Sequence, residues 1–344
     1  MKDVALILET NNLRGGSEDR EKILHGLTRL FLHYKNQTLD IKTLKEIIVT
    51  HDGISETEKA KVIRTTELKN LKFLQISPLD NYYQAKELGF QASTAAIVVF
   101  ADSDCVPVNE WLEKILLPFE TQSAQVVSGR TTYDHSLFGI AATTIDFMYF
   151  GSVLNPTKTK NFYANNIAFR RELFDRYHFV PIEGQYRGQC QALGLKLLKD
   201  GVPIHFVSKA KTIHKFPDSF LELIQLRIFR GQDTVGLTPF LAKAYLPKSL
   251  LWLKNCGPVL PILILSIRFF ASVFSIDRQD MPKVNFAQRI VVIAHILFIN
   301  AFDFIGMLLG SVRKLLPFFK ERENRTLSYH TESHNVSKTQ IRSV

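Results

Sequence analysis

Two acidic residues separated by a single serine, Asp102-Ser103-Asp104, directly follow the apolar run Ala95–Ala101. A run of small and β-branched apolar residues with little alternation is typical of a strand buried on both faces of a parallel sheet. Open α/β sheets bind ligands at the carboxyl ends of such strands. Because residues i and i+2 of an extended segment point to the same side, the two carboxylates can form an oxygen-rich site for Mg²⁺ or Mn²⁺ carrying a diphosphate. A turn that caps the strand is the alternative explanation.

The segments that must position this acidic pair alternate between strand and helix along the first 105 residues. Helical periodicity separates four strand-like segments, Val4–Leu8, Glu46–Thr50, Phe73–Ile76 and Ala95–Ala101. Repeated β-α-β units require right-handed crossovers and a mostly parallel sheet with helices on both faces. Loops after neighbouring parallel strands converge at one edge of the sheet, so we expect a shared crevice for Thr10, Asn12, Asp52 and Asp102.

The pattern is less regular after residue 105. We expect strands at Val126–Tyr133, within Phe162–Arg170 and at Ile204–Val207. Helical patterns occupy Trp111–Phe119, Phe138–Phe150, Arg171–Tyr177, Gln189–Lys199 and Phe220–Phe229.

Charge is distributed unevenly along the 344 residues. Residues 241–344 contain 14 Lys and Arg against 6 Asp and Glu, a surplus of +8 out of the net charge of +10. The basic residues therefore lie in the third of the chain that also holds the long apolar runs, which favours an anionic membrane surface over nucleic acid as the partner. The amino terminus lacks the pattern of a signal peptide, so we expect the body of the protein to be cytosolic. Three widely spaced cysteines indicate neither a disulfide framework nor a zinc site.

Two apolar stretches, Cys256–Ile276 and Ile290–Val312, are each close to the length of about 20 residues that crosses a bilayer. Arg268 lies in the first stretch and Asp303 in the second, and such polar groups would have to face protein or water. The stretches are therefore either two membrane spans or helices in the membrane interface. Basic residues outside both stretches place these flanks on the cytosolic side: Lys243, Lys248, Lys254, Arg313, Lys314 and Lys320.

Several motifs together resemble the family 2 glycosyltransferases, which have a GT-A fold. The resemblance runs from Val4 to about Asp233, roughly two thirds of the chain. Its motifs are Thr10-Asn11-Asn12 after the first strand, Glu46-Ile47-Ile48-Val49-Thr50-His51-Asp52-Gly53, Ala85-Lys86-Glu87-Leu88-Gly89, in which Glu87 replaces an asparagine, and Phe100-Ala101-Asp102-Ser103-Asp104. The resemblance implies that this half of the domain binds a nucleotide diphosphate sugar with its divalent ion.

Further motifs extend the resemblance. Asn165-Asn166-Ile167-Ala168-Phe169-Arg170-Arg171 is similar to a family segment near the donor sugar and acceptor, and His214 stands where relatives often place a histidine near the metal. Arg227-Ile228-Phe229-Arg230-Gly231 partly matches a Gln-x-x-Arg-Trp element, although an amphipathic helix on the membrane would explain it too. The implied metal ligands are Asp102, Asp104 and His214. The implied nucleotide-sugar ligands are Thr10, Asn12, Asp52, Asp102, Asn165, Asn166, Arg170 and Arg230.

The sequence departs from the family at the expected catalytic base. Inverting members have Glu-Asp-x-x-Leu on the helix before Gly201, whereas this chain reads Gln189-Cys190-Gln191-Ala192-Leu193. A neutral thiol at Cys190 is a poor base, since the pKa of a free cysteine is about 8.5. Glu183 in the preceding loop is our first candidate for the base, and Asp134 or an acceptor activated with help from the metal are alternatives.

We therefore expect an α/β protein of GT-A type, with a Rossmann-like, mostly parallel sheet, flanking helices and C-terminal membrane-associated helices. Residues 1–240 would form the glycosyltransferase domain, with a nucleotide-sugar half in 1–105 and an acceptor half in 106–240; residues 241–320 would be the membrane-associated helical region and 321–344 a polar, disordered tail. The expected function is the transfer of a sugar to a lipid-linked or polysaccharide acceptor, with Mn²⁺ or Mg²⁺ and with inversion. A nucleotidyltransferase and a catalytically inactive nucleotide-binding protein are the alternatives.

Overall fold

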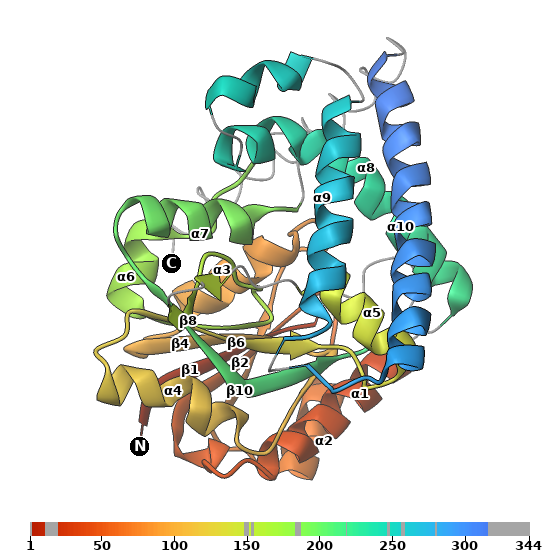
Figure 1. The fold of residues 1–344 in the computed structure, drawn as a ribbon. Coiled ribbons are helices and arrows are strands. Elements are labelled where there is room, and N and C mark those ends of the chain that lie inside the picture. Colours follow the sequence, from red (N-terminus) through yellow and green to blue (C-terminus); the bar gives the residue numbers. More distant parts are fainter. Residues whose placement is uncertain are drawn as a thin grey trace. The chain divides into compact units, whose positions relative to one another are not determined.

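The computed structural model describes residues 2–10, 20–147, 151–152, 155–182, 187–217, 219–245, 248–255, 259–278 and 281–315. Figure 1 shows the order of its elements. The strands are β1 (Lys2–Glu9), β2 (Leu44–His51), β3 (Leu71–Gln75), β4 (Ile97–Asp102), β5 (Cys105–Pro107), β6 (Val126–Thr132), β7 (Gly151–Ser152), β8 (Asn155–Thr159), β9 (Asn166–Arg170) and β10 (Ile204–His214). The helices are α1 (Arg20–Lys35), η2 (Ile41–Thr43), α2 (Glu56–Thr66), α3 (Tyr82–Ala92), α4 (Trp111–Thr121), α5 (Leu137–Asp146), α6 (Arg171–Tyr177), α7 (Gln189–Lys199), α8 (Phe220–Tyr245), η3 (Lys248–Asn255), α9 (Val259–Ser275) and α10 (Phe286–Leu315).

The strands form one mixed sheet in the order β3-β2-β1-β4-β9-β6-β10-β8-β7, and β5 pairs with β10. Strands β3, β2, β1 and β4 are parallel to one another, as the repeated β-α-β pattern predicts. Strand β9 then inserts antiparallel between β4 and β6, while β6 and β10 are parallel to each other. The predicted α/β fold with its mostly parallel sheet is confirmed. The short strands β5, β7 and β8 were not predicted.

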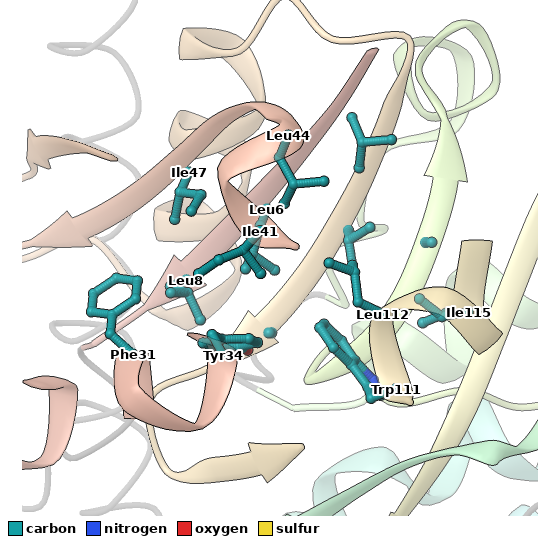
Figure 2. Close-up of a cluster of buried hydrophobic side chains, with 14 of the residues drawn as sticks. Leu6, Leu8, Phe31, Tyr34, Ile41, Leu44, Ile47, Trp111, Leu112 and Ile115 are labelled. Carbon is teal, nitrogen blue, oxygen red and sulfur yellow. The ribbon is translucent and has the colours of Figure 1, made fainter. Parts of the chain in front are cut away.

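Side chains that alternate along the buried strands fill two apolar clusters. In β1, Leu6 and Leu8 belong to one cluster and Ile7 belongs to the other, as the two-residue period of a strand requires. Figure 2 shows the first cluster, in which Leu6 and Leu8 lie with Tyr34 of α1 and Trp111 of α4. The sheet is thus covered on both faces, which leaves the strand ends to carry polar groups.

The chain divides into two compact units. Met1–Val180 and Gln189–Lys215 form the first, and Pro181–Gly188 and Phe216–Val344 form the second. The second unit begins at Phe216, apart from the segment Pro181–Gly188, whereas the sequence predicts the boundary at residue 240. The physical reason is that α8 packs closely on α10: a Cβ atom added at Gly231 of α8 would collide with the backbone oxygen of Asp303 in α10.

The two predicted apolar stretches correspond to α9 and α10, although residues 256–258 at the start of the first lie outside the described residues. Within the described part of the chain, one helix is long and apolar enough to cross a membrane, the segment Phe286–Val312 of α10. The apolar segment Ile262–Ser275 of α9 is shorter than that requirement. The finding supports one candidate span where the sequence predicts two. The predicted disordered tail lies outside the described residues.

Glu46 joins three segments at the amino-terminal end of the sheet. Its side chain is buried in β2, where it accepts hydrogen bonds from the Thr94 amide at 2.6 Å, the Ser93 hydroxyl at 2.9 Å and Lys72 Nζ of β3 at 2.9 Å. Burial by itself would raise the pKa of Glu46, but the hydrogen bonds from Lys72, Thr94 and Ser93 outweigh it and lower the pKa to about 2.

We predict that Glu46→Gln destabilises the protein by about 1–3 kcal/mol at pH 7, because buried donors lose a charged acceptor. The folded-state pKa lies below the ordinary value of 4.5, so the contribution of Glu46 is fully present above pH 4.5 and is lost as the pH falls toward 2. Urea unfolding of the wild type and the variant from pH 7 to pH 2.5 should show a difference that shrinks below pH 4.5. Glu67→Gln, at an exposed ion pair with Lys35, is the control. A difference that stays constant with pH would contradict the assignment.

Candidate functional site

The carboxyl ends of β1, β2 and β4 meet at one edge of the sheet. The register places Glu9 beside both Thr50 and Asp102. The Thr10 hydroxyl donates to the Thr50 carbonyl at 2.6 Å, and the Ser103 amide donates to the Glu9 carbonyl at 3.1 Å. The structure therefore brings Thr10 and Asp102 to the same edge, as predicted from the sequence.

Asp102 is buried and paired inside the protein. Its carboxylate accepts from Lys86 Nζ at 2.6 Å and from the Tyr82 hydroxyl at 3.0 Å, and the Lys86 ammonium also donates to the Ala101 carbonyl at 2.8 Å. Tyr82 and Lys86 stand one turn apart on the same face of α3. Burial raises the pKa of Asp102, and the charge of Lys86 opposes that effect. Asp102 therefore anchors the turn to α3, a role that differs from the predicted metal ligand.

Asp104 meets His214 because β5 pairs with β10. Cys105 lies opposite His214 in that antiparallel pair, and the Lys215 amide donates to the Asp104 carbonyl at 2.8 Å. His214 Nε2 lies 3.5 Å from Asp104 Oδ2, and both side chains are partly exposed. Potential ligand atoms of Asp104, Cys105 and His214 lie within 4.8 Å of one another. Two residues predicted as metal ligands are thus neighbours, although they stand 110 positions apart in the chain.

The tautomer of His214 follows from its neighbours. Nδ1 lies 2.7 Å from the Lys215 carbonyl, which can only accept, so Nδ1 carries the proton. This leaves Nε2, beside Asp104, as the ring nitrogen that could bind a metal ion. The rings of Tyr133 and Phe147 hold the imidazole at centroid distances of 5.5 and 5.6 Å.

Cys105 is less suited to a metal than its neighbours. Burial raises the pKa of its thiol well above the ordinary value, and the charges of Asp104 and Asp102 raise it further. Thiols bind metals as thiolates. One carboxylate and one imidazole, Asp104 and His214, are therefore the donor set that could hold a divalent cation.

Asp52 is exposed at the carboxyl end of β2. The turn that presents it is built by buried His51, whose Nδ1 accepts from the Gly53 amide at 3.3 Å and the Ile54 amide at 3.0 Å. Because β2 is parallel to β1, Asp52 lies at the same edge of the sheet as Asp102. The predicted ligand Asn12 and the predicted base Glu183 lie outside the described residues.

Asn165 and Asn166 are buried in the interior of the first unit. The Asn166 side chain accepts from Trp111 Nε1 at 2.8 Å and donates to the Ala210 carbonyl at 3.0 Å and the Thr212 hydroxyl at 3.2 Å. The side-chain Oδ1 of Asn165 accepts from the Thr131 hydroxyl at 2.9 Å. The amide of Asn166 is thus used to hold β9 against β10 and α4, which differs from the predicted contact with the donor.

Arg170 lies at the opposite edge of the sheet. Antiparallel β9 pairs Asn166 with Ala101 and Arg170 with Ile97, so Arg170 is about 17 Å along the sheet from Asp102, the nearer member of the acidic pair. Its guanidinium donates to the Phe119 carbonyl at 2.9 Å and the Ala124 carbonyl at 3.1 Å at the end of α4. Because β9 runs opposite to β4, Arg170 lies away from the edge where the sequence places it, and its predicted contact with the nucleotide sugar stays a prediction.

Cys190 begins α7 among apolar side chains and lies 3.5 Å from the Tyr83 hydroxyl. Burial raises the pKa of its thiol to about 11. A thiol that stays protonated cannot accept a proton from a sugar hydroxyl. Cys190 therefore packs the core instead of replacing the missing aspartate.

The other departure, Glu87, also has a structural partner. Its carboxylate accepts from the Phe179 amide at 2.8 Å and lies 2.9 Å from His178 Nδ1. Burial raises the pKa of Glu87, and these two partners oppose that effect. Glu87 thus fixes the segment that follows α6.

The sequence reasoning gave no role to Lys86, Tyr82 or Glu9. Lys86 lies inside the quoted motif, on the helix face that also carries Ala85 and Gly89. A lysine in the middle of a buried helix face signals a buried acid nearby, because an unpaired ammonium there would be too costly. Lys86 could therefore have been identified from the sequence as the partner of a buried acid.

Arg230 lies in the second unit, on α8. Burial raises the pKa of Asp233 above its ordinary value. The charge of Arg187, whose guanidinium lies 3.1 Å from Asp233, and the charge of Arg230 oppose that effect. Arg227, on the same helix, is buried in a two-point ion pair with Asp303 of α10 that includes a contact of 2.8 Å. Asp303 therefore faces protein, as predicted for a polar group in an apolar helix.

We predict that Lys86→Met destabilises the first unit by about 3–5 kcal/mol, because Asp102 is left as a buried charge without its cation. Lys86→Met/Asp102→Asn should recover part of that loss, since the second change removes the stranded charge. Urea unfolding of the two single variants and the double variant gives the coupling. Strictly additive losses would show that the pair is not coupled.

We also predict that Cys190→Ala keeps the catalytic rate of the protein within about threefold of the wild type, because a protonated thiol supplies no proton acceptor. The pH profile of kcat should keep its shape. A loss of about 100-fold or more with unchanged stability would restore Cys190 to the catalytic machinery.

Comparison with known proteins bears on the family and the fold. Residues 22–178 match the model of the glycosyl transferase family 2. The chain is 26% identical over 147 residues to glycosyltransferase AglE of Haloferax volcanii, a match that spans 42% of this chain and 46% of AglE. Its fold is similar to that of the mannosyltransferase PcManGT from Pyrobaculum calidifontis, solved in complex with GDP-Man and Mn²⁺, with a TM-score of 0.56, 13% identity and coverage of 90% of this chain and 86% of that one. Residues 22–178 therefore match the glycosyl transferase family 2, and the fold of the chain is of the GT-A type.

Proposed function

We propose that the protein transfers a sugar from a nucleotide diphosphate sugar to a lipid-linked or glycan acceptor at the cytosolic face of a membrane. One observation supports binding of the nucleotide sugar donor: Asp104 and His214 lie side by side at the edge of the sheet where α/β proteins bind ligands. Basic residues among the apolar C-terminal segments support the membrane half.

Within this proposal, Asp52 and Thr10 contact the nucleoside, and Asp104 with His214 holds the divalent ion. One carboxylate and one imidazole suit Mn²⁺ better than Mg²⁺, which prefers oxygen ligands. When bound, the ion supplies positive charge to the leaving diphosphate. Lys86 and Tyr82 keep Asp102 fixed, so that the turn carrying Asp104 is held in place before the donor arrives.

The acceptor half requires a base other than Cys190. Glu183 is our proposal, with inversion of the anomeric centre. Asp134 is the described alternative, exposed after the end of β6, but one oxygen of its carboxylate already accepts from the Ser136 hydroxyl at 2.6 Å and the Ser136 amide at 3.1 Å. That use in capping α5 favours Glu183.

A second candidate function is nucleotide binding without transfer. The protonated state of Cys190, at the position of the family's aspartate, favours it. A nucleotidyltransferase is disfavoured, because the matched family transfers sugars. Its characteristic loop would have to fall in Leu13-Arg14-Gly15-Gly16, outside the described residues.

We predict metal-dependent binding of one nucleoside diphosphate, measured by calorimetry with a panel that includes GDP and UDP, with and without Mn²⁺. Asp104→Asn should weaken that binding at least about tenfold, equivalent to about 1.4 kcal/mol. Asp3→Asn is the matched control, since it makes the same change at the opposite end of the sheet, where Asp3 pairs with Lys45. Equal affinity with and without Mn²⁺ would overturn the metal assignment. Donor hydrolysis in the same samples separates a transferase from a binding protein.

A further inference from the structure

Helix α10 carries an unbroken apolar surface along most of its length. Between Ile290 and Val312, every residue of the helix that is exposed is apolar. This segment is about 33 Å long at 1.5 Å per residue. The exposed residues are Ile290, Val291, Ala294, Leu297, Phe298, Ala301, Phe304, Ile305, Leu308, Leu309 and Val312.

The opposite face of α10 is packed against α8. Gly306 and Gly310 let the two backbones approach closely: a Cβ atom at Gly306 would collide with the Ile228 carbonyl, and one at Gly310 would lie 3.1 Å from Gln232 Cα. Asp303 on this face is buried with Arg227. Figure 1 shows α8 crossing α10 here. Small residues and polar pairs are how helices associate when the surrounding solvent is lipid.

Contacts along this crossing fix the level of α8 beside α10. The rings of Phe220 and Phe298 stack at 6.0 Å, and Ile228 meets Gly306. The segment of α8 between these contacts therefore lies beside the middle of the apolar surface of α10. That segment exposes Glu222 and Gln225 together with Phe220 and Leu221. If α10 crossed a bilayer, a carboxylate would lie near the centre of the hydrocarbon layer, where charged groups are very costly.

We propose that α10 lies in the plane of an anionic membrane, with its apolar surface embedded lengthwise in one leaflet and with Glu222 and Gln225 of α8 facing water. This inference rests on the membrane attachment in the proposed function and replaces a span with an interfacial helix. Charge supports lipid as the occupant of the surface. Lys283 and Arg289 lie near one end of α10 and Arg313 and Lys314 at the other, and residues 241–344 carry a surplus of +8.

Depth measurements test the orientation. In the full chain with Cys256→Ala, the variants Ile290→Cys, Leu297→Cys and Phe304→Cys each place a spin label on the exposed face, at intervals of about 10 Å. In vesicles of phosphatidylcholine and phosphatidylglycerol, an in-plane helix gives three equal, shallow depths. A spanning helix gives depths that change by about 10 Å from one label to the next, and that result would overturn the proposal.

Topology gives an independent readout. Lys283→Cys and Arg313→Cys, on either side of the apolar segment, should react with a membrane-impermeant maleimide from the same side of sealed native membranes. Labelling from opposite sides means a span and overturns the proposal. Glu222→Cys, a control on α8, should react with the same reagent from that side, whereas a buried, unreactive position 222 also argues for a span.

Two further outcomes separate this inference from the proposed function. The chain could bind a nucleoside diphosphate with Mn²⁺ but not partition into the vesicles. That result would overturn the membrane orientation and leave the donor site supported. The chain could instead form a dimer in detergent-free solution, with the spin labels immobilised in the absence of lipid. That result would show that a second copy covers the apolar surface of α10, which also overturns the proposal. Vesicle binding with equal depths but without nucleotide binding would support the orientation and refute the donor site.

Discussion

The buried ion pair between Lys86 and Asp102 determines the geometry of the candidate site. Removing both charges from water is expensive, and the pair is tolerable because the ammonium also meets a backbone carbonyl and the carboxylate also meets the Tyr82 hydroxyl. These contacts fasten α3 to the carboxyl end of β4. The turn that starts at Asp102 consequently has one orientation, which aims Asp104 at His214. A carboxylate paired inside the protein thus positions the partly exposed carboxylate of Asp104 beside His214.

The two carboxylates of Asp102-Ser103-Asp104 lie in different environments, although only one residue separates them. Residues i and i+2 were expected to act together, but the chain turns after Asp102, and β5 begins at Cys105. The two carboxylates therefore have different surroundings: the first is enclosed with a lysine, and the second is partly exposed beside an imidazole whose tautomer is set by a backbone carbonyl. Their surroundings, rather than their spacing, distinguish their roles.

The parallel half of the fold and the edge that carries the site were predictable from the sequence, because repeated β-α-β units leave few topologies. This topology places Thr10, Asp52 and Asp102 at that edge. The direction of β9 was not predictable, since a five-residue apolar strand has the same pattern in either direction, and Arg170 was misplaced as a result. The three-residue strand β5 was too short to recognise, yet it brings Asp104 to His214.

The C-terminal helices depend on the same rule about buried charge. Asp303 was conspicuous in the sequence because an acid in an apolar helix needs a partner, and Arg227 supplies it from α8. Since that partner comes from α8, the pair holds the exposed Glu222 carboxylate at the level of the apolar surface of α10. An isolated apolar helix of this length would favour spanning a bilayer, whereas α10 is fixed beside a charged group. In the proposed in-plane orientation the apolar surface meets lipid and Glu222 meets water, so the ion pair that ties α10 to α8 also constrains how α10 can meet a membrane.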